Sequence, residues 1–557
     1  MTGSRWRFIA WVYRDLMEEF DYIIVGAGSA GCVLANRLSA DPRTRVLLLE
    51  AGGSDRSLTI KMPAATDLYG IGNPRYDWRY MTEPDPTRNG RRDLWPRGKV
   101  LGGSSSINAM VYMRGQPSDY DSWARLGNSG WSYRDVLPFF RMCETNENGG
   151  DKFRGDKGPL QVGNLRVSHE SSDLFIAAAE AMGIPRNDDF AGSRLEGVGP
   201  IQATQRRGWR HSAADAYLRP AMRRSNLAVR TGVLASSILF ENRTATGVRY
   251  EYSNGQAKVA RARAEVILSA GAVASPQLLL LSGVGPGSQL SAMGIDCVAD
   301  VPGVGENLRD HVGAYLNYRI DIPTYNSEQT LLRKALHGAN WLFRGRGPGT
   351  TPGALSMAFV RSGPDVEDPD LQLHFTPIGY KLTPDELIVL DEPVVTAIPN
   401  VNRPKSRGRL CLAGPDHRLP PRIFPRLLDH EDDLIVLRRG GRIIRDIFAT
   451  QPLAVHIQGE LAPGPEIQSD SEWEDYLRRD SITIFHPCGT CKMGVDAMAV
   501  VDPELRLRGV SRLRVIDASI MPHLVSGNIN APTIMIGEKG AELVLRGAEN
   551  VTAVSNL

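Results

Sequence analysis

The chain has 557 residues, more than one hydrophobic core usually supports, so two or more domains are expected. Hydrophobic residues make up 42% and charged residues 23%, as in ordinary globular proteins. A net charge of +2 argues against a nucleic-acid-binding surface. Six cysteines in so long a chain argue against a disulfide scaffold and favour a reducing compartment, so a cytoplasmic protein is expected.

Residues 1–16 are predicted to be an N-terminal extension that precedes the first domain. Their apolar core, from Phe8 to Tyr13, is shorter than that of a signal peptide and is followed by two charged residues. Farther along, the uncharged stretch 266–284 has the length of a membrane-spanning helix, but Pro276 and Gln277 lie inside it. A buried strand followed by a buried helix is therefore predicted there, and no transmembrane segment is expected.

The first functional motif is GAGSAG at residues 26–31. It lies between two apolar runs, 22–25 and 45–49, which predict buried parallel strands, and a helix is predicted to begin at Ser29. The second strand ends in Glu50. A strand, a glycine turn, a helix and a second strand that ends in an acid together predict a dinucleotide-binding site.

Each glycine of this motif has a specific task in such a site. Gly26 permits a tight turn, Gly28 lets the backbone approach a pyrophosphate, and Gly31 lets the helix pack closely on the strand. The free N–H groups of the helix N-terminus then face the phosphates. Glu50 is placed to accept hydrogen bonds from ribose hydroxyls, which argues against NADP. The motif alone is compatible with either FAD or NAD.

A second glycine-rich loop, RGKVLGGSSSINAM, occupies residues 97–110. Gly102 and Gly103 precede three serines, so the loop offers backbone N–H groups and hydroxyls to a pyrophosphate or to the edge of a flavin ring. Apolar residues on both sides of the loop argue against a flexible serine-rich linker.

With this loop, the chain resembles the glucose–methanol–choline (GMC) family of FAD-dependent oxidoreductases, and within it the choline-dehydrogenase-like branch. Four blocks carry the resemblance in family order: GAGSAG, RGKVLGGSSSINAMVYMRG, GAVASPQLLLLSGVGP, and a C-terminal block with HPCGTCKMG, RVIDASIMP and SGNINAPTIMIGEKGA. Together they span residues 20–546, nearly the whole chain.

The resemblance implies the fold and its division into domains. We expect an α/β protein, α+β overall, in which a Rossmann-like FAD-binding domain is interleaved with a substrate domain built on an antiparallel sheet with helices. The FAD-binding domain is expected at 17–158, 219–318 and 481–557. The substrate-binding domain is expected at 159–218 and 319–480, which are richer in proline and charge.

The resemblance also implies which residues bind FAD. The expected cofactor-binding residues are Gly26, Gly28, Ser29, Gly31, Glu50, Ala51, Gly98, Val100, Gly102, Gly103, Asn108, Ala109, Met110, Val111, Val233, Ala270, Asp517, Ala518, Pro532 and Thr533. Some members of the family attach FAD covalently to a histidine of the second loop. Ile107 stands at the matching position here, so non-covalent FAD is expected.

The catalytic residues are also implied by the resemblance. Histidine suits the removal of a hydroxyl proton because its pKa lies near working pH, and His486 matches the family histidine that faces the flavin. Asn530 is expected to be its partner and to hold the substrate oxygen, with a turn residue before a helix as the alternative. Pro532 is expected to open the helix whose positive end faces the flavin. No metal site is expected.

Three further residues are expected near the substrate. Ile484 and Phe485 precede His486 and would shape the pocket. His374 lies in an alternating, strand-like stretch, from which it could reach the substrate or bond to the backbone at an interface.

Cys488 and Cys491 have the spacing of a redox dithiol or of half a zinc site. No second cysteine pair completes a zinc site, and Lys492 stands where a haem-attachment motif has histidine. The two cysteines are therefore predicted to be small residues that pack a turn, with a disulfide between them as the alternative.

The predicted reaction is the oxidation of a primary alcohol to an aldehyde, with a quinone, another carrier or O2 as the electron acceptor. Ala109 and the family branch favour a dehydrogenase over an oxidase that makes H2O2. A FAD-containing hydroxynitrile lyase is the remote alternative. A neutral alcohol is preferred to choline, because a quaternary ammonium needs an aromatic cage or a carboxylate, and no carboxylate can be placed beside Phe485. The acceptor leaves open a peripheral association with a membrane, and no oligomeric state is assigned.

Overall fold

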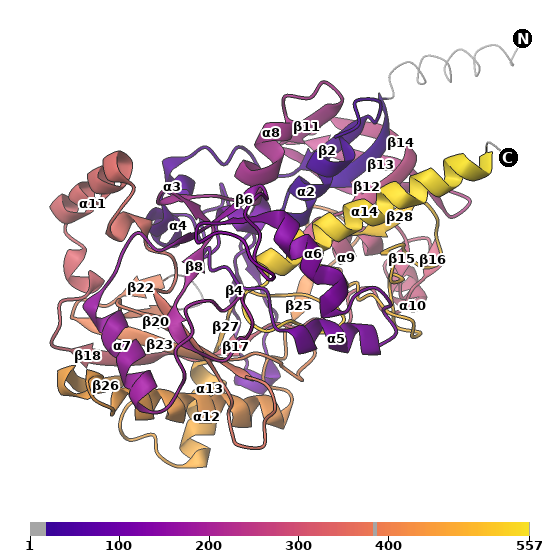
Figure 1. The fold of residues 1–557 in the computed structure, drawn as a ribbon. Helices are drawn as coiled ribbons and strands as arrows, with labels where there is room; N and C mark the ends of the chain where they lie inside the picture. The colour runs from indigo at the N-terminus through magenta and orange to yellow at the C-terminus, as the bar shows by residue number, and fades with distance from the viewer. Residues whose placement is uncertain (1–17, 383–386, 556–557) are drawn as a thin grey trace, which may run out of the picture.

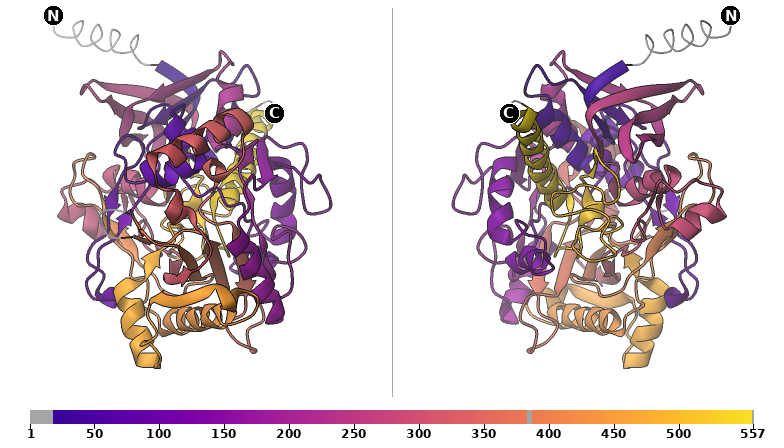
Figure 2. Two further views of the ribbon diagram at one scale, coloured as in Figure 1. Left: turned by 90° about the vertical axis from the view of Figure 1, so that its left-hand side faces the viewer. Right: turned by 90° about the vertical axis from the view of Figure 1, so that its right-hand side faces the viewer.

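The computed structural model describes residues 18–382 and 387–555, so the extension predicted at residues 1–16 lies outside the described part of the chain. Two large sheets organise the structure, and the chain passes between them several times (Figure 1). One sheet has seven strands and the other has eight. Figure 2 shows the first sheet at the top of the molecule and the orange helices that cover the second sheet at its base.

The seven-stranded sheet has the topology of a nucleotide-binding fold. Its strand order is β11–β2–β1–β14–β13–β12, with β28 paired to β14. The pairs from β11 to β14, and the pair of β14 with β28, are parallel, whereas β12, β13 and β14 form an antiparallel meander. The strands are β1 (Glu18–Val25), β2 (Val46–Glu50), β11 (Leu227–Thr231), β12 (Val233–Glu241), β13 (Thr244–Tyr252), β14 (Ala257–Leu268) and β28 (Leu513–Val515).

The first predicted motif folds as strand, helix and strand. Helix α2 (Ser29–Leu38) joins β1 to β2, and all five residues of β2 are buried, as in a parallel strand covered on both faces. The long C-terminal helix α14 (Asn530–Ser555) packs along α2 and α6 (Tyr133–Cys143), and Figure 1 shows it in yellow. Two helix N-termini, those of α2 and α14, therefore lie at the same edge of this sheet.

The eight-stranded sheet is antiparallel throughout its described pairs. Its strands are β26 (Ile457–Ala462), β18 (Leu316–Ile320), β23 (Val394–Val401), β20 (Leu371–Thr376), β19 (Ser356–Val360), β7 (Gly197–Pro200), β17 (Val312–Gly313) and β27 (Ile482–Thr483). One face packs on α7 (Glu170–Ala181), α12 (Glu431–Phe448) and α13 (Asp470–Asp480). Along β20, Leu371, Leu373 and Phe375 join that core while His374 points to the other face, as the alternation of a half-buried strand requires.

The predicted fold class is confirmed: a Rossmann-like sheet is combined with an antiparallel sheet and its helices. All strands of the parallel sheet fall inside the ranges expected for the FAD-binding domain. Strands β17, β18 and β27 belong to the antiparallel sheet, although β17 and β27, and the first part of β18, fall inside those ranges. The chain therefore changes from one sheet to the other a few residues away from the expected domain boundaries. The division into domains stays a prediction.

The uncharged stretch 266–284 is a strand followed by a helix, as predicted. Its first residues end β14, and α9 (Gly271–Leu281) follows within the same core. Within residues 18–382 and 387–555, no helix is both long enough and apolar enough to cross a membrane.

Candidate active site

A cavity of about 1180 Å³ lies between the two sheets. It exceeds the roughly 300–1,000 Å³ of typical small-molecule sites, which is consistent with a cofactor and a substrate together. Val25 and Leu49, near the ends of β1 and β2, line one part of it, so the cavity begins at the carboxyl edge of the parallel sheet. This edge is where doubly wound folds bind nucleotides.

The first glycine loop forms a tight turn against the end of β14. Gly26 has a φ of +101°, and a Cβ there would lie 2.5 Å from the carbonyl oxygen of Ser269. A Cβ on Gly31 would lie 1.9 Å from the carbonyl oxygen of Gly26, so only glycine lets α2 begin so close to β1. Gly28 caps α2 without a side-chain hydrogen bond and lines the cavity with Ser29. The first turn of α2 therefore has N–H groups available for a phosphate.

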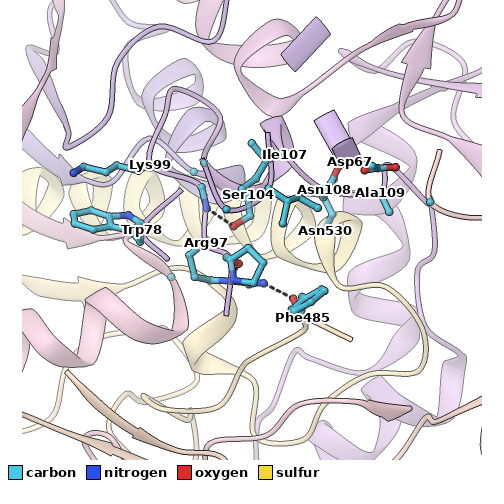
Figure 3. Close-up of a pocket in the computed structure, with 18 of the residues that line it drawn as sticks. Asp67, Trp78, Arg97, Lys99, Ser104, Ile107, Asn108, Ala109, Phe485 and Asn530 are labelled. Atoms are coloured by element: carbon cyan, nitrogen blue, oxygen red, sulfur yellow. Dashed lines mark hydrogen bonds between the residues drawn. The ribbon is translucent and has the colours of Figure 1, made fainter. Parts of the chain in front are cut away.

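The second glycine loop interlocks with the first. Gly103 has a φ of +53°, and a Cβ there would lie 2.7 Å from the Cα of Gly28. The serines divide their tasks: Ser105 and Ser106 donate to carbonyl oxygens within the loop, at 2.6 and 2.7 Å. Ser104 accepts from the N–H of Gly98 at 3.1 Å and lines the cavity (Figure 3). All three hydroxyls thus form hydrogen bonds within the loop, and of the three serines only Ser104 lines the cavity.

Glu50 lies at the end of β2 and is nearly buried. Its carboxylate accepts from the N–H groups of Ala27, at 2.9 Å, and Gly52, at 2.7 Å. Burial raises the pKa of Glu50 to about 7, and the two N–H groups oppose that rise. The carboxylate lines the cavity, and each of its oxygens keeps a second lone pair that can accept from a ribose hydroxyl.

Asn108 and Ala109 lie beside the cavity in the second loop (Figure 3). The side-chain oxygen of Asn108 accepts from Arg210 Nη1 at 2.9 Å and from the N–H of Met110 at 3.0 Å. Arg210 is buried, and burial lowers its pKa to about 10. This cation therefore sets the orientation of the Asn108 amide.

Most of the residues predicted to bind the cofactor line this one cavity. They are Gly26, Gly28, Ser29, Glu50, Ala51, Gly98, Gly103, Asn108, Ala109, Met110, Val111, Val233, Ala270, Asp517, Ala518 and Thr533. Four others, Gly31, Val100, Gly102 and Pro532, are packed behind the wall of the cavity rather than in it. Helix α14 begins at Asn530, so Pro532 lies within its first turn rather than opening it.

Asp517 connects two elements at the wall of the cavity. Its carboxylate accepts from the N–H of Gly271 at 2.9 Å, from the hydroxyl of Ser275 at 2.6 Å, and from the N–H of Ser519 at 2.8 Å. Burial raises the pKa of Asp517, and these hydrogen bonds oppose that rise. Asp517 therefore holds the start of α9 against the end of β28.

His486 follows β27 and faces the cavity with little exposure, 8%. Phe485, just before it, has a φ of +63°, a strained conformation that turns the chain. Two contacts hold this turn: Arg97 donates to the carbonyl oxygen of Phe485 at 2.6 Å (Figure 3), and Asp310 accepts from the N–H of His486 at 2.6 Å. Asp310 also accepts from the hydroxyl of Thr483. The backbone of the histidine is thus fixed from two sides.

The hydrogen bonds of His486 determine its tautomer. His311 Nε2 lies 3.0 Å from the carbonyl oxygen of Asn402, and because a carbonyl only accepts, Nε2 carries the proton. His311 Nδ1 is then an acceptor, and it lies 2.9 Å from His486 Nδ1. His486 Nδ1 must therefore be the donor, which leaves the lone pair of the neutral ring on Nε2.

Burial keeps both histidines of this pair neutral. Burial lowers the pKa of His311 to about 3 and lowers the pKa of His486 well below its usual range. The cationic forms of His311 and His374, and the guanidinium of Arg97, lower the pKa of His486 further. Burial also raises the pKa of Asp310 to about 7, and its hydrogen bonds from Thr483 and His486 oppose that rise.

The side chain beside His486 Nε2 is Asn528 rather than Asn530. Asn528 Nδ2 lies 3.1 Å from Nε2, and Gln372 donates to Asn528 Oδ1 at 3.2 Å, which fixes the orientation of the amide. Asn530 also lines the cavity, but its oxygen accepts from the hydroxyl of Ser29 at 2.8 Å. Asn530 therefore links the N-termini of α2 and α14, while Asn528 faces the imidazole.

The structure places His374, Ile484 and Phe485, the three residues predicted to lie near the substrate, in the lining of the cavity. His374 Nε2 lies 2.9 Å from the side-chain oxygen of Asn400, and burial lowers the pKa of His374 to about 4. Ile484 packs against the cluster formed by Tyr315, Ile398 and Ile482. Tyr315 forms an edge-to-face pair with Tyr380, with ring centroids 5.3 Å apart. This part of the cavity thus has an apolar and aromatic wall.

Cys488 and Cys491 are free thiols with no exposed surface. Burial raises the pKa of both well above that of an ordinary thiol. Cys488 pairs by backbone hydrogen bonds with Arg309, next to Asp310. The cysteines therefore pack the turn that follows His486, as predicted.

Several residues of the site were missed from the sequence. Asp310 and His311 are adjacent in the chain, and an acid next to a histidine just before an apolar stretch was the available signal. Arg97 lay inside a recognised loop, and Asn528 lay two residues from the asparagine that was chosen. Asp67, in α4 (Pro63–Tyr69), carried no signal, because nothing local connects it to the cavity.

Comparisons with known proteins agree with this geometry. Two family models, both described as GMC oxidoreductase, match residues 20–313 and 404–537. The chain belongs to the GMC oxidoreductase family. The predicted resemblance is confirmed, and membership makes the chain a FAD-dependent alcohol oxidoreductase.

Individual GMC relatives match over nearly the whole chain. The mitochondrial choline dehydrogenase of Homo sapiens is 44% identical over 551 residues, which cover 97% of this chain and 92% of that protein. The oxygen-dependent choline dehydrogenase of Photobacterium profundum is 43% identical and covers 94% of this chain and 93% of its own. The crystal structure of pyridoxine 4-oxidase from Mesorbium loti matches with a TM-score of 0.85, 34% identity, and 94% and 98% coverage.

The residues of this chain fit the FAD of a GMC oxidoreductase. The N-terminus of α2 lacks a side-chain cap, and two glycine loops approach each other so closely that a Cβ on Gly103 would collide with Gly28. Glu50 lies at the end of β2, where a ribose is bound in dinucleotide folds. Bound FAD would supply a hydride acceptor to the substrate side of the cavity.

Proposed function

We propose that the protein oxidises a primary alcohol to the aldehyde, with His486 as the base. The observation that carries this proposal is the hydrogen-bond chain from Asn402 through His311 to His486. It leaves the lone pair of His486 on Nε2, which lies 3.1 Å from the amide nitrogen of Asn528, and both residues line the cavity. A substrate hydroxyl bound at Nε2 would donate its proton to this nitrogen. The carbon that carries the hydroxyl would give up its hydride to the cofactor.

Asn528 is the second polar group of the proposed reaction. Its amide nitrogen, 3.1 Å from Nε2, can donate to the oxygen of an alcohol bound at His486 and stabilise the charge that develops on it. We propose this task for Asn528 in place of Asn530, because the amide nitrogen of Asn528 lies beside His486 Nε2, whereas the Asn530 side chain is hydrogen-bonded to Ser29. Arg97 and Asp310 would position the histidine, since both bond to the backbone of Phe485–His486.

We also propose that FAD is held without a covalent bond. Ile107 lines the cavity at the position that matches the covalently bound histidine of some family members, and its side chain has no nucleophile. Acid precipitation should release all of the flavin into the supernatant. Flavin absorbance that stays with the pellet would contradict this.

We propose a dehydrogenase whose acceptor is a quinone or another carrier. Support comes from Ala109 in the second loop and from the choline dehydrogenases among the relatives. The Photobacterium relative is named oxygen-dependent, and pyridoxine 4-oxidase is an oxidase by name. Turnover in air with detection of peroxide, set against turnover with a soluble quinone, separates the two classes.

A carboxylate in the cavity favours a cationic alcohol over the neutral substrate that the sequence suggested. Asp67 lines the cavity, and among the described residues no cation lies within ion-pair distance and no hydrogen bond reaches its carboxylate. Tyr315, Tyr325 and Tyr380 line the same cavity. Burial raises the pKa of Tyr380, and the charge of Asp67 raises it further. Aromatic rings and a carboxylate together recognise a quaternary or protonated amine.

The function is tested by anaerobic mixing of the purified yellow protein with a panel of alcohols. Choline and benzylic, furanic, polyol and long-chain alcohols are compared by the fall of flavin absorbance. Bleaching by at least one primary alcohol is expected, since hydride transfer reduces the flavin. A panel that leaves the flavin oxidised while a cyanohydrin is cleaved would instead indicate a hydroxynitrile lyase.

The role of Asp67 is tested by a selectivity ratio. Choline is compared with the neutral alcohol in which a tert-butyl group replaces the trimethylammonium group. The wild type should prefer choline, and Asp67→Asn should lose that preference while kcat/KM for the neutral alcohol stays the same. If Asp67→Asn leaves the ratio of the two kcat/KM values unchanged, Asp67 does not recognise the substrate. The proposed role of His486 would not be affected by that result.

A further inference from the structure

Helix α11 (Leu331–Arg344) presents its apolar side to solvent rather than to the protein. Five of its large apolar side chains are exposed: Leu331 by 87%, Leu332 by 72%, Leu336 by 59%, Leu342 by 48% and Phe343 by 82%. Surface helices of globular proteins usually bury this side. The outward orientation therefore requires a physical explanation.

The exposed residues form one continuous face. At the helical period, Leu331, Leu332, Leu336, Leu342 and Phe343 fall within about 140° of arc. Ala335 and Ala339 are exposed between them and complete the face. We call these seven residues the outer face of α11.

The opposite side of the helix attaches it to the protein. Trp341 is buried, donates to the carbonyl oxygen of Gly208 at 3.0 Å and packs on Trp209 at 4.1 Å. His337 Nε2 lies 2.9 Å from Glu328. These contacts fix the rotation of the helix about its own axis. The exposure of its outer face therefore does not depend on the rotamer of any single side chain.

The helix stands at the edge of the molecule and at the mouth of the cavity. Figure 1 shows α11 at the left-hand side, and the left view of Figure 2 shows it on the side toward the viewer. Lys334, His337 and Gly338 line the cavity from the inner side of the helix. Tyr69 lines the cavity as well and is 53% exposed. The outer face thus borders the entrance to the candidate active site.

Basic residues flank the outer face. Arg333, Lys334 and Arg344 lie in α11, Arg346 follows it, and the helix contains no acidic residue. Arg333 is paired with Glu328 at 2.5 Å, and Arg344 and Arg346 are exposed. An apolar face with a basic margin is the pattern of helices that lie in the interface of an anionic membrane.

We propose that the outer face of α11 docks the protein on the surface of an anionic lipid bilayer, with the mouth of the cavity next to the membrane. This inference goes beyond alcohol oxidation and does not depend on it. In that position, a lipid-soluble electron acceptor or substrate could reach the cavity without crossing bulk water.

A bilayer fits this surface better than a protein partner does. A helix of 14 residues is about 21 Å long, so one face of it offers less than the roughly 800 Å² that each partner gives to a standard interface. A bilayer needs no matching pocket and supplies the negative charge that Arg344 and Arg346 complement.

Vesicle flotation tests the proposal with the FAD-loaded protein. Vesicles of phosphatidylcholine alone are compared with vesicles that also contain phosphatidylglycerol. The wild type should float with the anionic vesicles, and Leu332→Asp combined with Phe343→Asp should lower its partition coefficient by at least about tenfold. Val455→Asp is the matched control, because Val455 is 64% exposed and lies outside α11.

Further variants keep the test decisive. Flavin content and the reduction of the flavin by a water-soluble alcohol should be the same in the wild type, the double variant and the control. If the aspartates lower the flavin content, Leu332→Ala with Phe343→Ala replaces them and should lower binding in the same direction. Arg344→Gln with Arg346→Gln should reduce the difference between the two kinds of vesicle.

Three results would overturn the proposal. The wild type could stay unbound on both kinds of vesicle, or the double variant could float as well as the control. The third is a dimer in solution that the double variant dissociates, without vesicle binding by the wild type, which would assign the outer face to a second copy of the chain.

Discussion

The two ends of the cavity are built in different ways. At the nucleotide end, Gly26, Gly28, Gly31 and Glu50 lie within 25 residues of one another, and local turn geometry sets their positions. At the histidine end, His486 depends on groups that are remote in the chain: His311 is 175 residues away, and Asn402 holds His311 in turn.

This difference separates two kinds of information in the sequence. A glycine turn is specified by its own backbone conformation, so a short motif predicts it. The proton-accepting state of a histidine is specified by its hydrogen-bond partners, and only the tertiary structure brings those together. Changes at the histidine end should therefore reduce the reaction rate, whereas changes at the nucleotide end should reduce retention of FAD.

The largest effect is expected from His486→Ala. Loss of the base should lower the anaerobic rate of flavin reduction roughly 10²–10⁴-fold, while the flavin content stays that of the wild type. His456→Ala is the control, since that histidine pairs with Asp321 at the surface. If the variant loses the flavin together with its activity, His486 contributes to FAD binding, and the distinction between the two ends of the cavity is wrong.

Asn528 and Asn530 sharpen the comparison, because they are two residues apart and face different ends. Asn528→Ala removes a hydrogen bond to a charged oxygen, worth about 1.5–3 kcal/mol, so kcat/KM should fall about 10–150-fold. Asn530→Ala removes the bond to Ser29 and should mainly increase the rate of FAD loss on dilution. If Asn530→Ala instead lowers kcat/KM and Asn528→Ala increases the rate of FAD loss, Asn530 is the residue that holds the substrate oxygen. Both readouts come from absorbance of the same samples.

The smallest effect is expected from Cys488→Ala and Cys491→Ala. Both side chains are buried, so each change should lower the free energy of unfolding by about 1 kcal/mol. The rate of flavin reduction should stay within about twofold of the wild type, because neither sulfur lines the cavity. Thermal unfolding and anaerobic mixing measure the two quantities. A large loss of rate would point to a redox role for the thiols.

The sequence predicted much of the fold, and most of the residues predicted to bind the cofactor line one cavity. Strong periodic runs around glycine turns identified β1, α2 and β2, and the uncharged stretch at 266–284 was correctly assigned to a strand and a helix. These elements depend on local patterns. Near residues 312–320 and 482–483 the chain enters the antiparallel sheet inside ranges expected for the FAD-binding domain. Two of these strands are only two residues long, which is too short for a recognisable sequence pattern.

The histidine end of the cavity was only partly predictable. His486 was found because a family motif surrounds it, but the choice between Asn528 and Asn530 depends on the direction of each side chain at the start of α14. Asp67 lies more than 400 residues before His486, and only the cavity brings them together. Likewise, α11 has an ordinary amphipathic pattern in the sequence, and only its orientation shows that the apolar side faces outward.

The pH dependence of flavin reduction tests the central claim most directly. Burial lowers the pKa of His486 well below 6.5, so the ring should be neutral and competent as a base at neutral pH. Protonation removes the lone pair on Nε2, so activity is lost as the pH falls through the pKa of His486. Anaerobic reduction by a saturating alcohol should therefore fall as the pH drops through the pKa of His486, and the titration of Asp310, whose pKa burial raises to about 7, should add a smaller step near neutral pH. A rate that increases as the pH falls would contradict a neutral His486 acting as the base.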